Sequence, residues 1–177
     1  MKKIILFYAV ILFLFGCGYT SEQKQKINLS YFDVKGYFEN EVNRLQKSSP
    51  AIYKMVEVNG STETKTVKIT DWKKELAIFS EADINKDSWK GLFKIIKQAD
   101  KETYVSDNEK VPIKEIEITY TSSKEVSKLL IIVKNNNSLY TSADSLFYYP
   151  DSVYKIVKSQ KIKLLSDRNY KVTGRFR

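Results

Sequence analysis

The feature of this sequence that most constrains its fold is the shortness of the connections between its strand-like segments. From Gly91 onward, stretches rich in β-branched and aromatic residues alternate with short polar turns such as Asn135-Asn136-Asn137. Parallel neighbours need crossovers of about a dozen residues or more, so segments joined this closely must pair antiparallel. The second half of the chain is therefore predicted to form an antiparallel meander.

The strands of this meander are predicted from the positions of the turns and from the alternation of apolar and polar residues. The segment 129–133 is apolar on both faces, which predicts a central strand covered on both sides. A sheet of about eight or nine strands is expected, and its twist would curl it as far as a half-barrel. The expected strands span 92–97, 102–106, 112–121, 129–133, 138–143, 145–149, 152–157, 161–165 and 170–176.

The pair Asn59-Gly60 predicts a β-hairpin upstream of the meander. Asn and Gly both accept the positive φ that a two-residue type I′ turn requires. Many of the flanking residues are β-branched, as strands prefer. This turn predicts three residue pairs: Val58 with Ser61, Tyr53 with Thr66, and Ile52 with Val67.

Two helices are predicted in the first half of the chain. The first follows Ser30, which forms an S-x-x-D capping box with Asp33, and it ends at Ser48-Ser49-Pro50. Thr70-Asp71 offers an N-cap for a second, shorter helix that runs to about Ala82. The apolar stripe of the first helix meets either the sheet or a membrane surface or partner, and we favour the sheet. The stripe comprises Tyr31, Val34, Phe38, Val42 and Leu45, and the second helix presents Trp72, Leu76 and Phe79.

These elements predict an α+β domain. An N-terminal amphipathic helix and a short second helix would pack on a curled antiparallel β-meander. In chain order the expected elements are a helix, a hairpin, a second helix and then the meander.

The first residues have the pattern of an export signal. Lys2 and Lys3 precede an unbroken apolar run over 4–15, which is shorter than the roughly 20 residues that a membrane-spanning helix needs. The segment Leu14-Phe15-Gly16-Cys17 resembles the bacterial lipobox, although Phe15 replaces the usual small residue. Cys17 is the only cysteine, and a lone thiol is otherwise a liability in an exported protein. An ordinary secreted protein and an uncleaved membrane anchor are the alternatives.

The lipobox resemblance implies a lipoprotein signal peptide over 1–16, a Cys17 carrying two or three acyl chains, and a lipidated tether over 17–29. Two acyl chains or more give a stable membrane anchor. The remainder, 30–177, has the size of a single domain. The acidic cluster that follows the cysteine in surface-exported lipoproteins of the Bacteroidota type is missing from 18–24. We therefore expect attachment to the outer membrane, facing the periplasm.

The residue types in the chain exclude several kinds of site. There is no histidine, and the single cysteine is assigned to lipidation, so His-based triads, Cys–His dyads and zinc sites are excluded. The six glycines are scattered and form no phosphate-binding loop. The segment 83–87 begins like an EF-hand, but Ser88 and Lys94 stand where that motif needs Gly and Glu. The chain is therefore expected to be no enzyme and to need no metal or cofactor.

Two groups of residues are candidate contacts. The first is a basic group near the C-terminus, which would meet anionic lipid headgroups or form the solubilising outer face of a hairpin. Three consecutive aromatics form the second group, and because they cannot all point into one core, at least one faces outwards or into a ligand cavity. No nucleic-acid partner is expected for an exported protein. The basic group is Lys161, Lys163, Arg168, Lys171, Arg175 and Arg177, and the aromatic group is Phe147, Tyr148 and Tyr149.

Residues 30–176 resemble a family of Bacteroidota-type bacterial lipoproteins through the segments YFDVKGYFENEV, VEVNGSTETKTV, DWKKELAIFSEADINK and KIKLLSDRNYKVTGRF. The resemblance implies no particular activity. In architecture the chain is also similar to the lipoprotein carriers of the outer-membrane sorting pathway. We expect a lipid-anchored, non-enzymatic envelope protein that binds an apolar ligand or lipidated partner in the concavity of its sheet. The alternative is an interaction subunit of an envelope complex that uses its sheet edge or its basic group.

Overall fold

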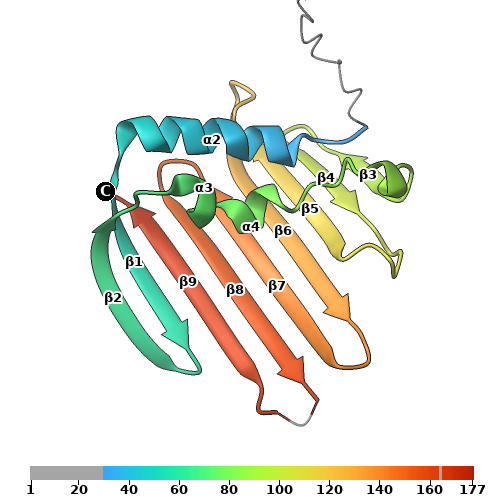
Figure 1. Ribbon diagram of the computed structural model, residues 1–177. Coiled ribbons are helices and arrows are strands. Elements are labelled where there is room, and N and C mark those ends of the chain that lie inside the picture. Colours follow the sequence, from blue (N-terminus) through green and yellow to red (C-terminus); the bar gives the residue numbers. More distant parts are fainter. Residues whose placement is uncertain (1–29, 164) are drawn as a thin grey trace, which may run out of the picture.

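The protein forms one antiparallel sheet with its helices on a single face. The computed structural model describes residues 30–163 and 165–177, and the expected signal peptide and Cys17 lie outside them. Nine strands pair in the order β2-β1-β9-β8-β7-β6-β5-β4-β3, and every neighbouring pair is antiparallel (Figure 1). With β2 and β3 at its two edges, the sheet is open and does not close into a barrel. The expected α+β class is confirmed.

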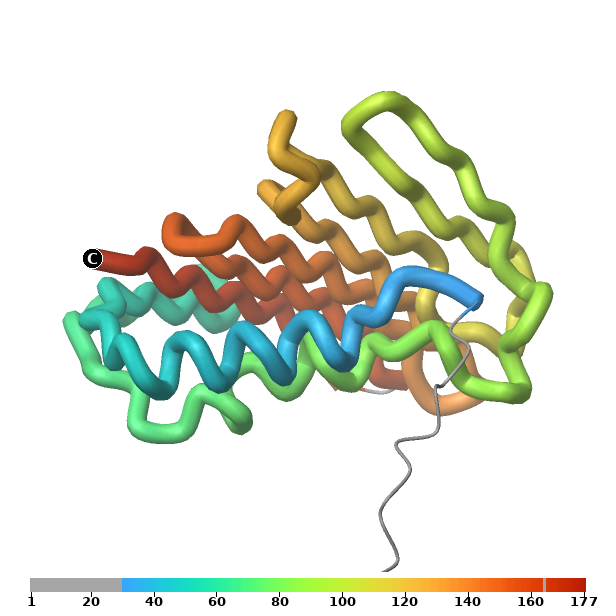
Figure 2. The backbone as a smooth tube through the Cα atoms, turned by 90° about the horizontal axis from the view of Figure 1, so that it is seen from above, coloured from blue at the N-terminus to red at the C-terminus, as the bar shows by residue number. Residues whose placement is uncertain are grey.

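The helices α2, α3 and α4 lie across the strands on the same side of the sheet (Figure 2). In chain order the elements are α2 (Val34–Ser48), β1 (Ala51–Val58), β2 (Ser61–Lys68), α3 (Trp72–Glu75), α4 (Ala77–Ser80), the 3-10 helix η1 (Asp87–Trp89), β3 (Lys94–Lys97), β4 (Lys101–Val105), β5 (Ile113–Tyr120), β6 (Val126–Asn136), β7 (Tyr140–Tyr149), β8 (Val153–Ile162) and β9 (Arg168–Phe176).

The first helix begins later than the sequence predicted. Asp33, not Ser30, is the N-cap of α2, and its carboxylate accepts a hydrogen bond from the Gly36 amide at 2.8 Å. A carboxylate caps as well as a hydroxyl and also interacts favourably with the positive end of the helix dipole. At the other end, Ser49 adopts the left-handed backbone (φ 44°) just before Pro50, so the predicted end of the helix is confirmed.

The predicted second helix is interrupted. Of the two offered cap residues Asp71 caps α3, and its carboxylate accepts a hydrogen bond from the Lys74 amide at 2.9 Å. The helix then breaks at Leu76 and continues as α4. The predicted apolar face is nevertheless correct, because Trp72, Leu76 and Phe79 are all fully buried.

The Asn59-Gly60 hairpin has the predicted register. Asn59 and Gly60 have φ of 49° and 88°, in the left-handed region that a type I′ turn requires. All three predicted pairs are present: Val58 with Ser61, Tyr53 with Thr66, and Ile52 with Val67.

The strands β7 and β8 are each longer than predicted. The segments 138–143 and 145–149 fall in one strand, β7, and 152–157 continues through 162 as β8. The polar residues that suggested interruptions are paired within this long hairpin, with Asp144 opposite Lys158 and Ala143 opposite Ser159. A strand that forms backbone hydrogen bonds to neighbours on both sides can continue through polar residues, although such residues suggest a turn in the sequence pattern.

The strand β6 is interior to the sheet, as predicted, but it is covered on one side only. Leu129 and Ile131 are fully buried beneath the helices, whereas Leu130 and Ile132 point to the opposite face and are half-buried. The expected cover on both faces is therefore wrong for the described residues, because their helices all lie on one face.

The longest-range pairing in the sheet joins β1 to β9. It runs antiparallel from the pair Ile52–Phe176 to the pair Val58–Tyr170. The pairing sets the N-terminal hairpin beside the end of the meander. It also places β9, the last of the described strands, between β1 and β8.

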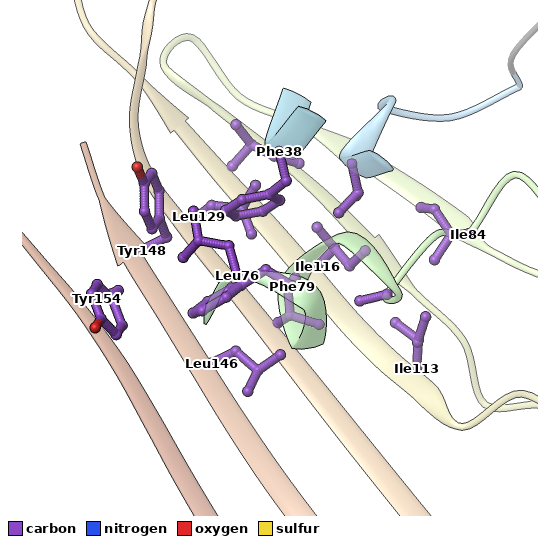
Figure 3. Packing of buried hydrophobic residues seen from close by; sticks show 14 of the residues in the cluster. Phe38, Leu76, Phe79, Ile84, Ile113, Ile116, Leu129, Leu146, Tyr148 and Tyr154 are labelled. Atoms are coloured by element: carbon purple, nitrogen blue, oxygen red, sulfur yellow. The ribbon is translucent and has the colours of Figure 1, made fainter. Parts of the chain in front are cut away.

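Large side chains fill the space between the sheet and its helices. Phe38 of α2 stacks on Phe79 of α4 with 5.1 Å between ring centroids, and both meet the Tyr148 ring of β7 edge-on (Figure 3). Trp72 lies parallel to Phe176 of β9 at 5.9 Å. Burying each such ring stabilises the fold by about 2 kcal/mol, so this cluster fixes the helices on the sheet.

Two carboxylates attach the helices to buried tyrosines of the sheet. Glu41 of α2 accepts a hydrogen bond from the Tyr148 hydroxyl at 2.5 Å, and Glu75 of α3 accepts one from the Tyr154 hydroxyl at 2.5 Å. Burial, and then the bond to the carboxylate, raises the pKa of both tyrosines. Both hydroxyls therefore stay protonated and remain hydrogen-bond donors.

Gly174 of β9 makes room for the ring of Tyr154. The two residues face each other across β8 and β9, and a Cβ at position 174 would overlap the ring and hydroxyl of Tyr154. The missing side chain therefore allows a tyrosine to lie over the neighbouring strand and reach Glu75.

We expect Gly174→Ala to lower the free energy of unfolding by about 2 kcal/mol, because overpacking a filled core strains it. The measurement is urea unfolding of fragment 21–177, followed by tryptophan fluorescence. This fragment contains every described strand and helix, so it should unfold in one cooperative transition.

The matched test is the double variant Gly174→Ala with Tyr154→Leu. The smaller leucine restores the space. The double variant should therefore lose less free energy of unfolding than the two single variants lose in sum. Unchanged stability of Gly174→Ala would contradict the steric role of this glycine.

Candidate functional site

Among the described residues, the sheet has a covered face, which carries α2, α3 and α4, and an uncovered face. Successive side chains of a strand point to opposite faces. Tyr148 and Tyr154 lie under the helices, so their sequence neighbours Phe147 and Lys155 lie on the uncovered face.

A pocket of about 370 Å³ opens on the uncovered face over β1, β9, β8 and β7. Within the described part of the chain, no acidic residue lines it. We call it the uncovered-face pocket, and its volume lies in the range of small-ligand sites. It is lined by Met55, Phe147, Tyr149, Val153, Lys155, Lys171, Thr173 and Arg175.

Thr173 lies at the centre of this lining. Across the strands it pairs with Met55 of β1 and Lys155 of β8, and along β9 its same-face neighbours are Lys171 and Arg175. These four long side chains leave only 7% of Thr173 exposed. Its Oγ1 is buried and has no hydrogen-bond partner within the described residues. Burying an unpaired hydroxyl costs about 1–3 kcal/mol, so this group is held at a cost to stability.

The three cations of the pocket have few counterions. Lys171 lies 3.6 Å from the carboxylate of Glu57, a long contact at the rim. Lys155 stands over the ring of Phe147, with 5.8 Å from Nζ to the ring centroid. Neither Lys155 nor Arg175 forms an ion pair in the part of the chain that the structure describes. The pocket is therefore electropositive.

An apolar strip leads away from the pocket across β7 and β6. Phe147 pairs with Leu130, and beside them Ile132 adds a further half-buried apolar side chain. The strip ends at Glu117 of β5, which accepts hydrogen bonds from Lys128 at 2.9 Å and from Lys101 at 3.1 Å. The bond from Lys128, more than that from Lys101, lowers the pKa of Glu117. This carboxylate thus stays charged at neutral pH and closes the strip with an ion-paired cluster.

The structure brings part of each predicted group together. Phe147 and Tyr149 from the aromatic group and Lys171 and Arg175 from the basic group all line the uncovered-face pocket. Tyr148 does not, because it is fully buried on the covered face. The prediction that the three aromatics cannot share one core is confirmed.

The other basic residues lie elsewhere. Lys161 and Lys163 are at the far end of β8, and Arg168 begins β9, so these three stand near the β8–β9 connection. Arg177 follows β9, with its guanidinium 5.4 Å from the centroid of the Tyr53 ring. The six basic residues therefore form no single cluster.

Sequence reasoning missed four lining residues as site residues: Met55, Val153, Lys155 and Thr173. Met55 comes from the hairpin, and only the β1–β9 pairing places it here. Thr173 lies between Lys171 and Arg175 in the two-residue alternation of β9, and that pattern could have found it. Lys155 and Val153 lie on β8, and only the β8–β9 pairing places them beside the residues of β9. The burial of Thr173 carries no sequence signal.

Two further grooves lie on the covered face. One of about 500 Å³ adjoins α3, and its Lys54 and Glu75 are already paired at 2.7 Å. The other, of about 710 Å³, runs between α2 and α4. Neither lining contains a buried unpartnered side chain among the described residues. The uncovered-face pocket is therefore the stronger candidate.

The described residues contain no group of three or more side chains suited to hold a metal ion. In the same residues no helix is both long and apolar enough to cross a membrane. Neither a protein-family model, nor a curated protein, nor a solved structure matches this chain. The pocket therefore has to be interpreted from its own chemistry.

We expect Thr173→Val to raise the free energy of unfolding of fragment 21–177 by about 1 kcal/mol. Valine keeps the shape, removes the buried unpaired hydroxyl and suits a strand. The control is Thr64→Val in β2, which lies in the same cross-strand row but is exposed and should change stability little. Urea midpoints compare the two, and a destabilised Thr173→Val would show that its hydroxyl is satisfied in the folded protein.

Proposed function

We propose that this protein is a lipid-anchored, non-enzymatic binding protein of the bacterial cell envelope. In this proposal an acylated Cys17 holds the domain at the outer membrane, facing the periplasm. The uncovered-face pocket then binds an apolar ligand or the acyl group of a lipidated partner. The anchor rests on the sequence pattern of 1–17, and the binding role rests on the pocket.

The observation that carries the binding role is the composition of the pocket. Ligand sites are usually concave, mostly apolar, and supplied with a few polar groups that orient the ligand. Met55, Phe147, Tyr149 and Val153 supply the apolar surface here, and the strip across β7 and β6 extends it. An apolar ligand would cover side chains that the described residues leave half-exposed.

The proposed position of the ligand differs from the one expected from the sequence. The space between the sheet and its helices, where the sequence placed a ligand, is filled by Phe38, Phe79 and Trp72. The expected half-barrel curl of the sheet is part of this proposal. A sheet curled around its helices would leave the uncovered face free for the ligand.

The chemistry of the lining supports binding rather than catalysis. Its polar groups are three cations and the hydroxyls of Thr173 and Tyr149. The chain has no histidine, and within the described residues no carboxylate reaches the pocket to act as a general base.

We expect fragment 21–177 to bind N-phenyl-1-naphthylamine, an uncharged apolar fluorophore whose emission rises on leaving water. Phe147→Ser should weaken binding about tenfold, since it removes most of the contact area of one ring. Titration of probe fluorescence gives the affinities.

The matched control is Tyr170→Ser. Tyr170 lies on β9 at the covered face and lines the groove beside α3. If Tyr170→Ser abolishes probe binding and Phe147→Ser does not, the probe binds in that groove and not in the uncovered-face pocket. Absence of any probe binding would favour the interaction-subunit alternative.

For the anchor, mass spectrometry of the native full chain should find an N-terminus at Cys17 with the added mass of two or three acyl chains. Cys17→Ser should move the protein out of the membrane fraction, because no acyl chain remains to hold it. An unmodified chain that still begins at Met1 would contradict the proposed location.

A further inference from the structure

We propose that the uncovered-face pocket selects a single-chain anionic amphiphile. Its acid group lies over Thr173, and its hydrocarbon chain runs along Phe147 towards β6. This inference rests on the proposed function and adds the chemical class of the ligand. The acid group is a carboxylate or a phosphate monoester, which share the oxyanion that the site recognises.

The position of the acid group follows from the groups around Thr173. The Oγ1 of Thr173 is buried without a partner among the described residues, so it has a hydrogen bond to donate. Lys155 faces it from β8, and Arg175 follows it by two residues on β9. Neither cation has an ion-pair partner in the described chain. A hydroxyl donor between two unpaired cations is an arrangement suited to an oxyanion, since charge-assisted hydrogen bonds are the strong ones.

The charge of the pocket disfavours other head groups. Three cations, Lys155, Lys171 and Arg175, surround one residue, and only Lys171 approaches a carboxylate. Their mutual repulsion opposes the folded state. An anion relieves this repulsion, a neutral head leaves it unchanged, and a cationic head adds to it.

The position of the chain follows from the register of the sheet. From Thr173 the same cross-strand row continues through Lys155, Phe147 and Leu130 to Glu117. Neighbouring strands are about 4.8 Å apart, so the row from β9 to β6 is roughly 14 Å long. A single extended hydrocarbon chain can lie on this surface. The ion-paired Glu117 marks the end of the row, where a longer chain would meet charge.

The test compares three ligands with similar chains and different heads: laurate, dodecanol and dodecyltrimethylammonium. Each displaces N-phenyl-1-naphthylamine from fragment 21–177 below its micelle concentration. Laurate should bind at least about tenfold more tightly than dodecanol, and dodecyltrimethylammonium should bind most weakly.

The variants are Lys155→Gln and Arg175→Gln, with Lys161→Gln as the matched control. Lys161 lies on the same strand and face as Lys155 but outside the pocket. Each pocket variant should weaken laurate binding about tenfold and leave dodecanol binding unchanged. Lys161→Gln should leave both unchanged, and circular dichroism confirms that all variants fold.

The outcomes separate the two proposals. If dodecanol binds as tightly as laurate and the pocket variants change neither, the anionic class is wrong while the proposed function stands. If the probe itself does not bind, so that none of the three ligands can displace it, both the anionic class of the ligand and the proposed binding function are wrong.

The last experiment is flotation of the protein with vesicles of phosphatidylcholine, with and without phosphatidylglycerol. If flotation depends on lipid charge and on Lys155 while monomeric laurate does not bind, the proposal of a ligand in the pocket is wrong. The cations of the pocket would then contact a membrane surface instead.

Discussion

The pairing of β1 with β9 is the interaction on which the rest of the structure depends. Without it the N-terminal hairpin would be a separate two-stranded ribbon, which is marginal in water, and β9 would be a sheet edge. The pairing also positions α3, because Lys54 of β1 and Tyr154 of β8 lie on either side of Gly174 and both reach Glu75. On the opposite face it brings Met55 beside Thr173 and so completes the uncovered-face pocket.

The two faces of the sheet differ in what covers them. The covered face is filled with stacked rings and joined to its helices by hydrogen bonds such as that from Tyr148 to Glu41, although Trp72 Nε1 and one carboxylate oxygen of Asp144 are buried there without partners among the described residues. The uncovered face leaves a hydroxyl at Thr173 and cations at Lys155 and Arg175 without partners among the described residues. Buried unsatisfied groups cost stability, and the one on the uncovered face lies among cations.

Local features of the fold could be predicted from the sequence, and distant ones could not. Asn59-Gly60 determined the hairpin register because the turn itself requires positive φ. The β7 and β8 strands were predicted as four, since polar residues such as Asp144 resemble turns until their pairing partner is known. The candidate aromatics and cations were recognised by type, but their grouping depends on strand order. The β1–β9 pairing is a long-range contact with no local signal.

The place of β9 inside the sheet has a consequence for biogenesis. The last of the described strands is an interior one, with partners on both sides. One neighbour, β8, directly precedes it in the chain, whereas the other, β1, is the first described strand. The β1–β9 pairing can therefore form only after β9 has been synthesised, and it carries the loop-closure entropy of nearly the whole described domain. Until then the nascent domain is an unfinished sheet with unpaired strand edges, a form that is prone to aggregate.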